Sequence, residues 1–174
     1  MICEKHRAAA LHLPLAAGTL YAWAQTVLTG ALLFDTFVLY PNIFADVPQS
    51  LSTSMQFLSR ASPGSFLPGL GAFTLATGLV ALWAWRRERR VLVCFLAGFM
   101  LVIAFDFVAS ALYFWPRNTI MFTEGLRVHS AAKLLEASRQ FQFAHWIRVA
   151  ACLIASCCAM LGLVAAVRQS ARNR

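Results

Sequence analysis

Four long apolar runs constrain this chain more than any other feature of its sequence. They cover roughly residues 16–40, 66–85, 91–115 and 143–167, and a helix needs about 20 mostly apolar residues to span a membrane. Of the 174 residues, 60% are hydrophobic and only 13% are charged, about half the share that is usual in soluble domains. The sequence therefore predicts an all-α fold, an integral multi-pass four-helix bundle that forms a single membrane domain over residues 1–174 in a lipid bilayer.

Basic residues gather at the ends of the apolar runs, as topology signals do, and they form no stripe that could follow a nucleic-acid backbone. Nucleic acid is therefore not expected as a partner, although the net charge is +8. Short loops rich in Lys and Arg stay cytoplasmic, so we expect the loop between the second and third runs, and with it both termini, on the cytoplasmic side. These segments carry Arg86, Arg87, Arg89, Arg90, Lys5, Arg7, Arg168, Arg172 and Arg174. A cleaved signal peptide over residues 1–24 is the alternative for the first run.

The two outer loops carry most of the polar character of the chain. The first loop, residues 41–64, is expected to contain a short amphipathic helix across the outer mouth of the bundle. Its apolar positions at helical spacing are Leu51, Met55 and Leu58. The second loop begins at Pro116, where we expect the third helix to end, and the helical pattern returns at about Ser130. The fourth helix is thus expected to extend above the membrane.

Four ionisable residues lie within the apolar runs: Asp35, Asp106, His145 and Arg148. At 1.5 Å per residue, Asp35 lies roughly 7 Å before the end of the first run and Asp106 roughly 13 Å before the end of the third. The fourth helix runs the opposite way, so all four residues fall in the outer half of the bundle. Ionisable groups in a membrane usually face a bundle interior or a wet cavity, and we expect a functional site at this depth.

Several interpretations of these residues stay open. One arginine and two aspartates at one depth can form a charge-neutralising cluster that only fixes helix register. A proton relay or a substrate site is the functional interpretation. Asp35, Asp106 and His145 also match the donor types of a two-carboxylate, one-histidine metal site, although no resident metal or other cofactor is our first expectation.

Small residues recur along one face of the fourth run, at Ala151, Ala155 and Ala159. Such a stripe is typical of close helix packing in membranes. It predicts either a seam within the bundle or a face for a homo-oligomer or a larger membrane complex.

Short motifs at the ends of the runs add a family resemblance. The first run ends at Tyr40-Pro41, the third ends in Trp115-Pro116-Arg117-Asn118, and the fourth opens with His145-Trp146-Ile147-Arg148. In these motifs, and in its proline-punctuated outer loop, the chain resembles the anthrone-oxygenase-like family of four-helix membrane proteins. The resemblance covers most of the chain and rests on the P-x-N and H-x-x-R steps.

Characterised members of that family oxidise anthrones, which are flat tricyclic polyketides, to anthraquinones with dioxygen and without a metal or flavin. The resemblance thus implies a hydrophobic small-molecule substrate, with His145 or Asp106 as the general base and Arg148 as the oxyanion partner. Asp35 and Asn118 are the expected polar contacts of the substrate. The apolar slot is expected from Phe37, Tyr113, Phe114, Trp115 and Phe141.

A second class of function is also compatible with the sequence. The chain could be a non-enzymatic membrane subunit or a transporter-like protein whose polar cluster binds a lipid, an ion or a partner helix. Four helices are few for a transporter that works alone, so this class implies an oligomer or a larger complex.

Overall fold

The computed structural model describes residues 2–172, with side chains from residue 13 onward, and this part of the chain is helical without strands. Four segments are long and apolar enough to cross a membrane: Leu13–Ile43, Pro63–Ala84, Arg89–Arg127 and Ala131–Arg172. The predicted all-α four-helix membrane bundle is therefore confirmed. Lys5, Arg7 and Arg174, which entered the charge argument, lie outside the described side chains.

The first span combines α1 (Ile2–Phe34), a π-helical segment η1 (Asp35–Leu39) and the short α2 (Tyr40–Ile43). Helix α3 (Gln49–Phe57) follows in the outer loop. Its Leu51 is buried in an apolar cluster beneath it, whereas Phe57 is exposed. This is the amphipathic helix that the spacing of apolar residues predicts.

The second span is α4 (Pro63–Ala84). It begins with a capping box, in which Ser62 and Ser65 satisfy each other's backbone N–H groups, as helix N-termini require. The span starts three residues before the predicted position because Pro63, the first helical residue, needs no N–H there.

The third span is longer than predicted, and it does not end at Pro116. It runs through α5 (Arg89–Val102), η2 (Ile103–Val108), η3 (Ser110–Phe114), α6 (Trp115–Asn118), η4 (Thr119–Glu124) and η5 (Gly125–Arg127). Segments η2, η3 and η4 have wide π-helical turns, and the Trp115 N–H bonds the Ser110 carbonyl five residues back. Pro116 then opens a new α-helical turn, a position where its missing N–H costs no hydrogen bond.

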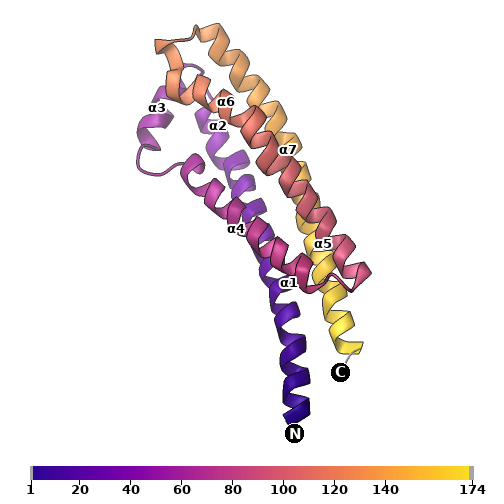
Figure 1. Ribbon diagram of the computed structural model, residues 1–174. Coiled ribbons are helices and arrows are strands. Elements are labelled where there is room, and N and C mark those ends of the chain that lie inside the picture. Colours follow the sequence, from indigo (N-terminus) through magenta and orange to yellow (C-terminus); the bar gives the residue numbers. More distant parts are fainter. Residues whose placement is uncertain (1, 173–174) are drawn as a thin grey trace.

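The fourth span is α7 (Ala131–Arg172), which begins where the sequence predicts. Its 42 residues extend over roughly 60 Å at 1.5 Å per residue, about twice the hydrocarbon thickness of a bilayer. Helix α7 packs along α1 and α5, and α4 packs along α1. In Figure 1 the α4–α5 turn lies at the same end of the bundle as the start of α1 and the end of α7, whereas α3 and α6 lie at the other end.

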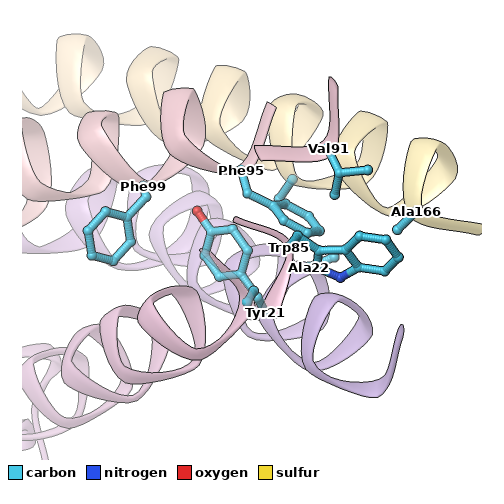
Figure 2. Close-up of a cluster of buried hydrophobic side chains, with 9 residues drawn as sticks. Tyr21, Ala22, Trp85, Val91, Phe95, Phe99 and Ala166 are labelled. Carbon is cyan, nitrogen blue, oxygen red and sulfur yellow. The ribbon is translucent and has the colours of Figure 1, made fainter. Parts of the chain in front are cut away.

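The inner half of the bundle is a closely packed apolar core (Figure 2). Tyr21 meets Phe95 edge to face, with 5.5 Å between ring centroids. A Cβ atom on Gly162 would lie 2.5 Å from the Phe95 ring, and one on Gly78 would lie 2.6 Å from the Phe99 ring. Helices α4, α5 and α7 therefore approach closely because glycines receive the aromatic rings.

The small-residue stripe of α7 lies inside this packing. Ala151, Ala155 and Ala159 are all buried, and a Cβ atom on Gly98 of α5 would lie 2.9 Å from the Ala155 carbonyl oxygen. The stripe is the seam between α5 and α7. It is therefore not available as the outer face for an oligomer that the sequence left open.

Candidate functional site

Arg148 is the centre of the polar residues in the outer half. It lies on α7, it is 7% exposed, and its Nη1 donates to the Ser110 Oγ at 3.3 Å. Its Nη2 donates to the His145 Nδ1 at 3.0 Å, and its guanidinium carbon lies 4.0 Å from the centre of the Phe114 ring. The third span and α7 together thus hold this cation in one place.

The hydrogen bonds of His145 determine its tautomer. Its Nδ1 accepts from Arg148, which has only donors. Its Nε2 lies 2.8 Å from the Thr36 Oγ1, and this hydroxyl donates to the Leu32 carbonyl at 2.6 Å. Thr36 is therefore the acceptor, so His145 is a neutral imidazole that carries its proton on Nε2.

The His145 ring is also enclosed by aromatic rings. It stacks on Phe141, with 4° between the ring planes and 6.2 Å between centroids, and the edge of Tyr40 lies at 4.6 Å. The side chain is 1% exposed. Both ring nitrogens have partners within the protein, Arg148 and Thr36. His145 therefore helps to hold the guanidinium in position.

Asp106 lies on η2. Its Oδ2 accepts from the Cys152 thiol at 2.9 Å. No Lys, Arg or His nitrogen described in the structure lies within 4.0 Å of this carboxylate. Asp106 and Arg148 are therefore not a direct ion pair, but they line the same cavity.

That cavity, which we call the inner chamber, has a volume of about 170 Å³. A second cavity of about 450 Å³, the outer chamber, lies beneath α3. The two share several wall residues: Tyr40, Pro63, Gly64, Trp115, Asn118 and Phe141. The Asn118 Oδ1 is buried and has no hydrogen-bond partner in the described part of the chain, so an acceptor stands unused where the chambers meet.

The structure brings together most of the residues that the sequence singles out. Arg148 and Asp106 line the inner chamber with Phe114, and Trp115, Asn118 and Phe141 line both chambers. Tyr113 and Phe37 lie elsewhere. The Tyr113 hydroxyl donates to the Gln140 carbonyl and its ring stacks on the Arg117 guanidinium, while Phe37 packs on Trp146 and is exposed.

Asp35 does not join the chambers either. It lines a separate groove between α1, α3 and α4, one position along the helix from Thr36, which bonds His145. Adjacent residues of a helix point about 100° apart, so these two polar side chains face different sites.

Two residues of the site were not predicted from the sequence: Ser110, which bonds Arg148, and Cys152, which bonds Asp106. For Ser110, the third run contains a pattern that could have indicated it. Asp106, Ser110, Phe114 and Asn118 recur every four residues and therefore lie along one helix face. All four line the inner chamber.

The floor beneath the inner chamber is polar. Gln25 is fully buried, and its Nε2 donates to the Thr29 Oγ1 at 3.4 Å. Thr29 lies 2.8 Å from the Ser156 hydroxyl, and Ser156 donates to the Gln25 carbonyl at 3.3 Å. These polar side chains of α1 are thus buried against α7.

No three His, Cys, Asp or Glu side chains gather closely enough to hold a metal ion within the described residues. Asp35, Asp106 and His145 accordingly do not form one group in this structure. They are apart because Asp35 lines the groove, Asp106 lines the inner chamber and His145 is bonded to Arg148.

Comparisons with known proteins add no further identification. No protein-family model matches the chain, and neither the curated proteins nor the solved structures contain a similar one.

Proposed function

We propose that the protein is a membrane-embedded oxygenase that converts a flat, hydrophobic, anthrone-like substrate with dioxygen and without a resident cofactor. One observation carries the proposal: a cation and a carboxylate, Arg148 and Asp106, line one aromatic cavity inside the membrane. An apolar slot, a base and a cation are the three elements that proton abstraction from such a substrate needs.

The sizes of the chambers suit a substrate with several rings. An apolar cavity of about 150 Å³ holds benzene, so the inner chamber at about 170 Å³ accommodates one ring. The outer chamber adds about 450 Å³, which brings the pair into the usual range of roughly 300–1,000 Å³ for ligand sites. A tricyclic molecule would thus extend through both chambers.

Asp106 is the base in this proposal. Its Oδ2 is engaged by Cys152, which leaves Oδ1 to receive a proton from the substrate. The ring carbonyl of the substrate lies at Arg148, whose side chain lines the same chamber as Asp106. As the proton leaves, negative charge develops on that carbonyl oxygen, and a fixed cation in a site without bulk water stabilises it most strongly there.

The chemical steps balance as follows. Asp106 takes one proton from the methylene carbon between the rings, and the resulting anion gives two electrons to dioxygen as a carbon–oxygen bond forms. The peroxide takes up a proton. Loss of the second methylene hydrogen as a proton then breaks the oxygen–oxygen bond, which releases water and leaves a carbonyl group. One substrate and one dioxygen thus give one quinone and one water.

Oxygen uptake by the full-length protein in liposomes with anthrone as the substrate tests the proposal, with empty liposomes subtracted. Asp106→Asn and Arg148→Gln are each expected to lower the rate about 100-fold or more, as the loss of a base or an oxyanion donor does. Tyr113→Phe is the matched control, because this ring lies on the same span outside the chambers. Wild-type uptake no faster than empty liposomes, or full activity in both variants, would contradict the proposal.

We also propose that both termini are cytoplasmic, which places the chambers in the half of the membrane away from the cytoplasm. The basis is the cluster of arginines at the α4–α5 turn, because such clusters remain on the cytoplasmic side. This orientation lets a hydrophobic substrate reach the chambers from the outer leaflet.

A further inference from the structure

Asp35 is a buried carboxyl group for which the described part of the chain offers no partner. The residue is 4% exposed, and its Oδ2 is buried and makes no hydrogen bond within the described residues. No basic nitrogen in the described residues lies within 4.0 Å of it. Buried polar atoms almost always have partners, and an ionisable residue within a membrane usually marks a site. The missing partner therefore points to a ligand.

The groove in front of Asp35 is large and apolar. It has a volume of about 760 Å³ and lies between α1, α3 and α4, within the usual size range for small-molecule sites. Three of its aromatic wall residues, Phe34, Phe57 and Phe66, are more than half exposed. The groove is thus open toward the lipid, and a hydrophobic compound can enter it from the side.

The acidic residue of this groove is not the one that lines the inner chamber of the proposed oxygenase. On the first span, Leu28, Leu32 and Tyr40 face the inner chamber, whereas Asp35 and Asn42 face the groove. The groove adjoins the outer chamber, with which it shares the wall residues Ile43, Ser54, Leu58, Ser62 and Pro63. Asp35 lines only the groove and Asp106 lines only the inner chamber, so the two carboxyl groups can be changed independently.

The charge of the groove selects the ligand. Among the described residues that line the groove, Asp35 is the only ionisable one. The other polar residues there are neutral: Asn42, Ser54 and Ser62. A carboxylate in apolar surroundings is complemented by a cation that also donates hydrogen bonds, because both attractions are strong where water is scarce. An ammonium group on an apolar body meets this requirement.

The depth of Asp35 narrows the choice further. It lies five residues, or roughly 7 Å, before Tyr40 along the helix, within the apolar first span Leu13–Ile43. The amine of a head group would have to enter the hydrocarbon region to reach it. We therefore propose that this groove binds a lipophilic amine, a small compound whose protonated amino group donates to Asp35 while its apolar body fills the space beneath α3.

Equilibrium dialysis of decylamine against the full-length protein in phosphatidylcholine nanodiscs tests the proposal, with empty nanodiscs subtracted. Saturable binding is expected, at least 10-fold tighter than that of decanol, which has the same chain without the charge. Asp35→Asn keeps the side-chain shape and is expected to weaken decylamine binding at least 10-fold, with decanol binding unchanged. Asp46→Asn, which removes an exposed outer-loop carboxylate, is the matched control and is expected to bind as the wild type does.

Equal binding of decylamine and decanol by the wild type would overturn the proposal, as would equal losses in the Asp35 and Asp46 variants. Ala31→Phe is a second test that leaves Asp35 in place, since Ala31 lines the groove and a larger side chain would narrow it. This variant is expected to lose decylamine binding, and retained binding would show that the amine sits elsewhere. Unchanged oxygen uptake in all three variants would separate this site from the chambers.

Discussion

Replacing His145 by phenylalanine separates a supporting role of this residue from a catalytic one. The substitution keeps an aromatic ring of similar size between Phe141 and Tyr40, where the imidazole stacks. It deletes both ring nitrogens and with them the hydrogen bonds to Arg148 and Thr36. The packing thus survives, while the hydrogen bond between η1 and α7 and the one to Arg148 are lost.

The expected loss of stability follows from these two bonds. A hydrogen bond to a charged group contributes about 1.5–3 kcal/mol, which applies to the 3.0 Å contact with Arg148. Hydrogen bonds between membrane helices average about 0.6 kcal/mol, with a maximum of about 1.7, which applies to Thr36. His145→Phe should therefore destabilise the protein by about 2–5 kcal/mol, and Thr36→Val by about 0.6–1.7 kcal/mol.

Unfolding in mixed micelles, followed by tryptophan fluorescence, measures both losses, and oxygen uptake measures the effect on Arg148. The double variant should lose less than the sum of the single ones, because His145→Phe has already removed the bond to Thr36. We expect His145→Phe to lower stability and uptake together. A variant as stable as the wild type that has lost all uptake would refute this reasoning, since His145 would then act directly on the substrate.

Two further predictions concern packing and orientation. Gly162→Ala should destabilise the protein by about 1–3 kcal/mol in the same unfolding assay, since its new Cβ would lie 2.5 Å from the Phe95 ring; Gly30→Ala, with open space at that position, should be neutral or stabilising by up to about 1 kcal/mol. In intact cells, a membrane-impermeant thiol reagent should label a cysteine introduced at Gln49 and not one introduced at Glu88. The reverse labelling pattern would show that the termini are not cytoplasmic.

Length and hydropathy were sufficient to predict the spans, because the bilayer demands long apolar helices and the chain has four such runs. The end of the third span was predicted wrongly. Proline usually ends a helix because it lacks an N–H, but the wide turn of η3 lets Trp115 bond five residues back and Pro116 begin a new turn. Neither residue type nor spacing predicts such a π-helical segment, so this extension of the third span could be found only in the structure.

The depth of the site could also be predicted, since the rise per residue fixes how far Asp106 and Arg148 lie from the ends of their helices. The direction of each side chain could not. Asp35 faces a groove instead of the chamber, because the positions of the neighbouring helices decide which cavity each helix face meets. Whether His145 faces a cavity or another side chain depends on the packing of three helices, which helical periodicity within one segment does not determine.

The support of Arg148 explains why the site can be both rigid and incomplete. A guanidinium has five N–H donors, and the protein uses Nη1 for Ser110 and Nη2 for His145 while Nε has no partner among the described residues. The two bonds made inside the bundle fix the plane of the cation, and its side chain lines the chamber, where a bound molecule meets its positive charge. Because unpaired donors are costly where water is scarce, a bound oxyanion would gain affinity from relieving that cost. Its gain would be largest when the charge is localised on the oxygen, which is the state that proton transfer to Asp106 creates.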